Sequence, residues 1–199
     1  FIVPLDADDW LADKGVELMV KTFFDVRNQE PSKIVAFVFG NMMLHGARSG
    51  PKECFANPFE LLFFNTLSYC LMWDREILLK LGLYDQDMSL GYEDWELAIR
   101  ATSRGYSAEK VANSVLNYRV QPNGMLLSKS KPNHEVIFEK IRKLHINAYS
   151  GEKKITLTQV LGHKSRLLAP VLLSLYVIYK VPLGERIISW VFKKRFSWL

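Results

Sequence analysis

Alternation between strand-like and helix-like segments is the feature that most limits the folds open to this chain. Ile34–Met43 (IVAFVFGNMM) is rich in branched and aromatic residues, which predicts a strand. Asp13–Val26, just before it, repeats apolar residues at helical spacing, which predicts a helix packed on a sheet. The alternation continues with predicted strands at Phe1–Leu5, Ser68–Met72 and Lys110–Val120, and predicted helices at Phe59–Phe64, Asp74–Lys80, Glu93–Ser103 and Glu135–Ala148. These segments predict an α/β fold, a mixed sheet with flanking helices.

Charge divides the chain into two parts. Residues 1–150 contain 17 Lys and Arg against 19 Asp and Glu, whereas residues 151–199 contain 9 against 2. The net charge of +5 therefore comes from the second part, which we predict to be a basic, amphipathic, helical tail. Its cations alternate with aliphatic rather than base-stacking residues, which argues against a nucleic-acid partner.

The tail leaves two interpretations open. Leu167–Tyr179 is apolar but shorter than the ~20 residues that span a bilayer. Ile187–Trp198 mixes aromatic and aliphatic residues with clustered cations, which suits a helix lying on an anionic membrane. A helical pair packed on the protein is equally compatible. Two cysteines, Cys54 and Cys70, are too few for a disulfide framework, so we expect a cytoplasmic protein, with peripheral contact at the inner face of the membrane as one option.

The first chemical motif is Leu5-Asp6-Ala7-Asp8-Asp9, at the end of the predicted strand Phe1–Leu5. Three carboxylates within four residues repel one another unless a cation offsets their charge. A turn after the strand allows Asp6 and Asp8 to converge on Mg²⁺ or Mn²⁺, which prefer oxygen ligands. The alternative is a solvated acidic turn, with Asp9 as the cap of the following helix.

The second motif is Gly91-Tyr92-Glu93-Asp94-Trp95-Glu96-Leu97, in which a loop leads into a helix with an acidic start. A carboxylate at Asp94 is suited to accept a proton from a bound hydroxyl group. The alternative is ordinary helix electrostatics, with Glu96 and Arg100 as an i,i+4 pair.

Together, and in this order, the motifs resemble those of the family 2 glycosyltransferases, which have the GT-A fold. The stretches that carry the resemblance are LDADDWL, LGLYDQDMSLGYEDWELAIRATSRG and LNYRV, within about Phe1 to Gly124. The resemblance implies that Asp6 and Asp8 hold the divalent metal on the donor diphosphate and that Asp94 is the catalytic base. It also implies substrate contacts from Asp9, Glu93 and Trp95.

The implied activity is that of an inverting glycosyltransferase in surface polysaccharide or glycolipid synthesis. It would transfer a sugar from a nucleotide-diphosphate sugar to a saccharide or glycolipid acceptor, with Mn²⁺ or Mg²⁺. One departure is Gln121, near the place where many relatives carry a metal-binding His, and its neutral amide is a poor metal ligand.

A larger departure is that nothing in this sequence corresponds to the nucleotide-binding βαβ region with which the relatives begin, and we expect that region upstream of Phe1 in the intact protein. We therefore expect residues 1–150 to be the acceptor-binding, catalytic half of a partial GT-A domain, inactive alone. An exposed sheet edge would then favour a homodimer. Two alternatives stay open: an inactive binding or oligomerisation module, and a different metal-dependent enzyme that acts on phosphates.

Overall fold

The computed structural model describes residues 1–149, 155–163, 165 and 167–195. Its centre is a mixed sheet in the order β1-β5-β2-β3, with β4 paired to β2. Strands β2 and β5 run parallel, from Val35 opposite Ser107 to Gly46 opposite Val120, and the other pairs are antiparallel. The strands are β1 (Trp10–Leu11), β2 (Val35–Gly46), β3 (Gly50–Lys52), β4 (Met72–Trp73) and β5 (Ser107–Val120). The predicted mixed α/β class is confirmed.

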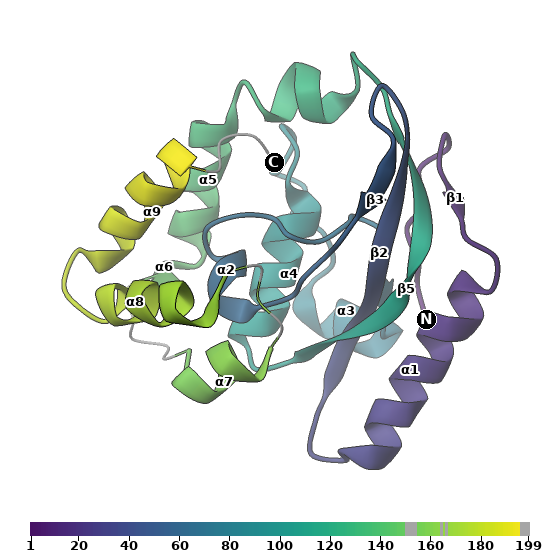
Figure 1. Ribbon diagram of the computed structural model, residues 1–199, viewed down its shortest axis with the longest axis horizontal. Coiled ribbons are helices and arrows are strands. Elements are labelled where there is room, and N and C mark those ends of the chain that lie inside the picture. The colour runs from purple at the N-terminus through teal and green to yellow at the C-terminus, as the bar shows by residue number, and fades with distance from the viewer. Residues whose placement is uncertain (150–154, 164, 166, 196–199) are drawn as a thin grey trace.

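Helices cover both faces of this sheet (Figure 1). One face packs against α1 (Gly15–Gln29). The opposite side holds the remaining helices, which are α2 (Pro58–Leu61), α3 (Arg75–Leu81), α4 (Glu93–Ser103), α5 (His134–Leu144), α6 (Ile146–Tyr149), α7 (Leu157–Gly162), α8 (Ala169–Tyr179), α9 (Gly184–Arg195) and the π-helical turn η1 (Leu126–Ser130).

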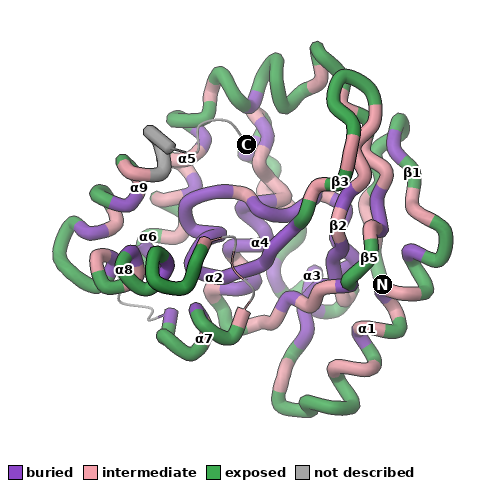
Figure 2. Tube along the Cα trace, viewed as in Figure 1, coloured by how far each residue is buried: buried purple, intermediate pink, exposed green. Residues whose placement is uncertain are grey.

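Strand β2 is the buried centre of the fold and separates two apolar clusters (Figure 2). Val35 and Val38 pack on the α1 side, together with Met19. Phe37 and Phe39 lie in the larger cluster on the opposite side. Successive strand residues point to opposite faces, which separates Val38 from Phe37 and Phe39, and a register shift between Val35 and Phe37 accounts for Val35 lying on the side of Val38.

Three predicted elements were wrong in their details. Phe1–Leu5 is not a strand, because its pairing is a single bridge between Ile2 and Trp73. Ser68–Met72 is replaced by the shorter β4, because local side-chain hydrogen bonds hold the stretch before it in an irregular conformation. The strand predicted at Ile34–Met43 is longer at its end, because β2 continues to Gly46 and the chain returns in a hairpin as β3. Gly46 and Gly50, on either side of the turn between β2 and β3, have φ of 93° and 119°, values that glycine adopts without strain.

The edge formed by residues 1–5 is accessible. The side chains of Phe1 and Leu5 are exposed, and Ile2 is bonded through its backbone to Trp73. An accessible extended segment of this kind can pair with a second chain. The homodimer stays a prediction, which light scattering on the purified chain would test.

The tail packs on the rest of the protein through α2. Asn57 donates from Nδ2 to the Val160 carbonyl at 2.8 Å, and the buried Glu60 carboxylate accepts from the Leu167 N–H at 3.1 Å. Val160 belongs to the same apolar cluster as the centre of the sheet. The prediction that the tail packs on the protein is therefore confirmed. Two other predictions lie outside the described residues: the boundary at residues 150–151, and the end of the predicted helix at Phe196–Trp198.

Replacing Asn57 by Ala should lower the free energy of unfolding by about 2–4 kcal/mol. Asn57 is completely buried, its Oδ1 caps α2 by accepting from the Phe59 N–H at 3.1 Å, and its amide satisfies the Val160 carbonyl. Thr156→Ala is the control, since Thr156 caps α7 at an exposed position and should cost about 1 kcal/mol. Equal losses in urea denaturation would contradict the anchoring role of Asn57.

Candidate functional site

The first acidic motif forms a tight turn beside the sheet. The Asp9 N–H donates to the Asp6 carbonyl at 3.2 Å, and the Asp6 N–H donates to the Tyr69 hydroxyl at 3.0 Å. The side chains of Asp6 and Asp8 are exposed. Burial raises the pKa of Asp6, and the charges of Asp9, Asp8 and Glu93 raise it further. The turn therefore places its carboxylates close enough to repel one another.

Asp9 differs from Asp6 and Asp8 because its carboxylate is buried and both of its oxygens accept hydrogen bonds. Oδ2 accepts from the Tyr69 hydroxyl at 2.7 Å, and Oδ1 accepts from the Arg119 N–H of β5 at 2.6 Å. The interpretation of Asp9 as a helix cap was wrong, because α1 begins after Lys14 without a side-chain cap. Asp9 instead fixes the turn to the sheet, and its predicted substrate contact stays a prediction.

Asp8 accepts hydrogen bonds from residues at the end of β5 and just after it. The Gln121 amide donates to the Asp8 carboxylate, and Arg119 Nε donates to the Asp8 carbonyl at 3.1 Å. The Arg119 guanidinium also lies over the Trp10 ring, 5.9 Å from its centroid. Gln121, which the sequence marks only as a departure, is therefore a direct partner of Asp8.

Asp94 lies in the first turn of α4 and keeps some accessible surface. Burial raises the pKa of Asp94 to about 6, and the charge of Glu93 adds to this rise. Hydrogen bonds from the Trp95 backbone and from Asn65, whose Nδ2 is 3.4 Å from Asp94 Oδ2, act in the opposite direction. A carboxylate with a pKa near neutrality can both accept and release a proton under physiological conditions.

The two motifs share one electrostatic environment, although they are more than eighty residues apart in the sequence. Burial raises the pKa of the Tyr118 phenol, and so do the charges of Asp9, Asp6, Asp8 and Asp94. Burial likewise raises the pKa of Tyr84, with contributions from Asp94, Glu93 and Asp6. We call Asp6, Asp8, Asp9, Glu93 and Asp94 the acidic site.

Comparison with known proteins adds no family. No protein-family model matches the sequence, and no curated protein is significantly similar to it. The functional argument for this chain therefore depends on its own residues.

Trp95, next to Asp94 in α4, is a buried packing residue. Its side chain is 2% exposed, its Nε1 donates to the Leu61 carbonyl at 2.6 Å, and its ring stacks on Phe138 with centroids 5.8 Å apart. A ring packed in this way offers little surface for stacking against a sugar. Its predicted acceptor contact stays a prediction, and the structure gives Trp95 a packing role that holds the start of α4.

The opposite face of α4 carries a separate charged cluster. The predicted pair of Glu96 and Arg100 is confirmed, with Arg100 Nε 3.0 Å from Glu96 Oε1, and His145 Nε2 is 2.7 Å from the same carboxylate. These residues line a groove of about 680 Å³ that includes neither Asp94 nor the Asp6–Asp9 turn. The alternative interpretation, ordinary helix electrostatics, is therefore confirmed for Glu96 and Arg100, and it remains an alternative for Asp94, which also lies in the first turn of α4.

A divalent cation is chemically compatible with the acidic turn. Within the described ranges, no group of three or more His, Cys, Asp or Glu side chains is arranged to hold a metal. Mg²⁺, however, usually binds through one or two carboxylates and completes its shell with water and substrate phosphates. Asp6 and Asp8 supply such a pair, and the repulsion that raises the pKa of Asp6 is relieved by a cation.

Sequence reasoning missed Asn65 and Tyr69, which bond to Asp94 and Asp9 respectively. Both are single polar residues in an irregular stretch between α2 and β4, and no pattern distinguishes them. Their partners are 29 and 60 residues away, so only the tertiary fold reveals these roles.

Gly91→Ala should reduce stability by about 2–3 kcal/mol and should displace the start of α4. Gly91 has φ of 108°, and a Cβ there would lie 2.2 Å from the buried Ser130 Oγ. Gly105→Ala is the matched control, since Gly105 also has positive φ but nothing lies within 4 Å of its Cβ position. Thermal unfolding should show the larger loss at Gly91, and a loss no greater than at Gly105 would contradict the close approach.

Proposed function

We propose that this chain carries the catalytic and acceptor-binding part of an inverting glycosyltransferase with a GT-A fold. The observation that supports it best is that Asp94 and acids of the Asp6–Asp9 turn act together on the same two side chains, since both raise the pKa of Tyr84 and of Tyr118. A base for a hydroxyl group and a pair of carboxylates for a metal-bound diphosphate are the two parts that such a reaction needs.

Asp94 is the proposed general base. As the acceptor oxygen forms its bond to the anomeric carbon, the hydroxyl proton passes to the Asp94 carboxylate. The bond from that carbon to the diphosphate oxygen breaks on the opposite side, so the configuration inverts and a nucleoside diphosphate leaves. Asn65 orients the carboxylate through its 3.4 Å contact, and Glu93, the neighbouring acid, is the proposed contact for acceptor hydroxyls.

Asp6 and Asp8 are the proposed ligands of Mn²⁺ or Mg²⁺, which would offset the charge on the departing diphosphate. Asp9 keeps the turn in place through Tyr69 and β5. The saccharide or glycolipid acceptor and the nucleotide-sugar donor are part of this proposal.

The proposal is tested by an assay of sugar transfer. A panel of nucleotide-diphosphate sugars is incubated with saccharide acceptors and Mn²⁺, and nucleoside diphosphate release is measured. We expect release that depends on donor and acceptor, with the opposite anomeric configuration in the product by NMR. Metal-dependent release of phosphate from phosphomonoesters without transfer would favour the phosphate-acting enzyme. Binding of a donor without any turnover would favour the inactive binding module.

A further inference from the structure

The outer surface of the tail is apolar where a water-facing helix is usually polar. Leu172, Leu175 and Tyr179 bury one side of α8 in the protein core. The sequence of α8 contains no charged residue, and apart from Ser174 its exposed residues are apolar. A helix of this apolar character is normally surrounded by apolar material, and here the described residues cover one side of it.

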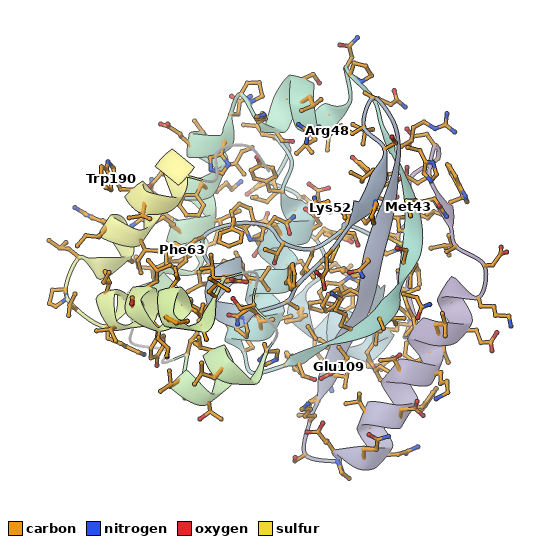
Figure 3. All side chains as sticks on the ribbon, viewed as in Figure 1. Met43, Arg48, Lys52, Phe63, Glu109 and Trp190 are labelled. Atoms are coloured by element: carbon orange, nitrogen blue, oxygen red, sulfur yellow. The ribbon has the colours of Figure 1, made fainter. Side chains whose placement is uncertain are left out.

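The exposed apolar side chains continue from α8 through the connecting turn into α9. Leu168 is 76% exposed, and Val177 and Leu183 are each 65% exposed. Trp190 points outward from α9 at the periphery of the molecule (Figure 3). We call this surface the tail patch, and it comprises Leu168, Val171, Val177, Leu183, Ile187 and Trp190.

Cations accompany the tail patch, and acids are nearly absent from its sequence. Residues 153–199 contain a single acid, Glu185, and its carboxylate is paired with Arg142 and lies 3.9 Å from Arg186 Nε. Lys180 and Arg186 are exposed, and Lys193 and Lys194 follow Trp190 by three and four positions. Apolar surface beside an excess of positive charge is complementary to an anionic lipid surface.

We propose that the tail patch binds the surface of an anionic membrane, with α8 and α9 lying in the plane of the interface. Among the described helices, none has the length and apolar character needed to cross a bilayer, so the contact is peripheral. A second copy of the chain is a poorer occupant, because a symmetric contact would bring two strongly basic surfaces together. This inference stands independently of the proposed enzymatic activity.

The test is co-sedimentation of the full chain with vesicles. One set contains phosphatidylcholine alone, and the other contains equal parts of phosphatidylcholine and phosphatidylglycerol. We expect binding to the anionic vesicles that weakens at high salt, and much weaker binding to the neutral ones. No binding to the anionic vesicles would overturn the proposal.

Two variants separate the apolar and the electrostatic contributions. Leu168→Ser with Val177→Ser removes exposed apolar surface, and because Leu168 is the N-cap of α8, Ser there favours the helix. Arg186→Gln, Lys193→Gln and Lys194→Gln together remove three charges, and each charge should contribute roughly five-fold to binding. Val16→Ser is the matched control, an exposed valine of α1 on the far side of the sheet. The proposal requires that both tail variants lose binding and that Val16→Ser keeps it.

Light scattering identifies the competing occupant. If the serine pair of substitutions converts a dimer into a monomer while vesicle binding is unchanged, the tail patch is an interface between copies and the membrane proposal is wrong. An unchanged oligomeric state together with lost vesicle binding supports the membrane proposal.

Discussion

Replacing Asp94 by Asn should lower the rate of sugar transfer by about 100-fold or more, since a general base usually contributes ~10²–10⁴-fold. Donor binding should change little, because the donor contacts are assigned to Asp6 and Asp8 on the neighbouring turn. The amide keeps the size of the carboxylate and can still accept from Asn65, so the local structure is preserved. Transfer above about a tenth of the wild-type rate would contradict the assignment of Asp94 as the base.

The pH dependence of the transfer rate provides a second test of Asp94 as the base. Asp94 accepts a proton only when it is ionised, and its pKa is raised to about 6 by burial and by Glu93. Transfer should therefore be fastest above about pH 7 and should fall as the pH decreases through 6. A transfer rate that stays constant down to about pH 4.5 would show that no group with this pKa acts in the reaction.

Stability measurements distinguish lost catalysis from lost folding. A carboxyl group whose pKa is higher in the folded than in the unfolded chain binds its proton more tightly when folded. Its ionisation therefore destabilises the fold above the folded-state pKa, and the effect disappears below the unfolded-state pKa of about 3.9. Asp94→Asn should thus raise the melting temperature at about pH 8 and leave it nearly unchanged below about pH 4. If Asp94→Asn is more stable but inactive, the charge of Asp94 lowers the stability of the fold and is needed for function.

Removal of the divalent cation should abolish transfer to a similar extent. We expect loss of activity in chelator, recovery on addition of Mn²⁺, and a loss of about 100-fold or more in Asp8→Ala. Asp13→Ala is the matched control, because Asp13 is an exposed acid outside the turn and should have no effect. Full activity in chelator would mean that the Asp6–Asp9 turn is only a solvated turn.

Gln121 allows the metal site to be strengthened as well as removed. Its amide already contacts the Asp8 carboxylate, so a histidine there would place an imidazole nitrogen beside the same ligand. Gln121→His should lower the Mn²⁺ concentration for half-maximal activity by roughly ten-fold. An unchanged requirement in Gln121→His would place the metal away from Asp8.

Local signals predicted the elements that surround the base. The helix predicted at Asp74–Lys80 is α3, in which Asp74 is the cap that accepts from the Ile77 N–H at 3.0 Å and Gly82, with φ of 90°, ends the helix. The helix predicted at Glu93–Ser103 has the same bounds in the structure. Such features depend on neighbours in the sequence, which is why they can be predicted without the fold.

Long-range contacts account for what the sequence did not predict. Strand β1 pairs with β5 over a separation of about a hundred residues, and the two-residue strand itself has no hydrophobic pattern to recognise. The bonds of Asp9 to Tyr69 and Arg119, and of Asn57 to Val160, likewise join distant segments. No periodicity or spacing marks such pairs, so the support of the acidic site emerges only from the packed structure.

The parallel pairing of β2 with β5 has a consequence for how the protein folds. Residues paired between the two strands are about seventy positions apart in the sequence, so their register forms only after a long loop closes, which is an entropically costly and slow step. Arg119 of β5 also provides the N–H that holds Asp9. The late step that completes the sheet is therefore also the step that brings the acidic turn into place. In refolding experiments, enzymatic activity should return together with the last signal of tertiary structure, and not with the earlier signal of helix formation.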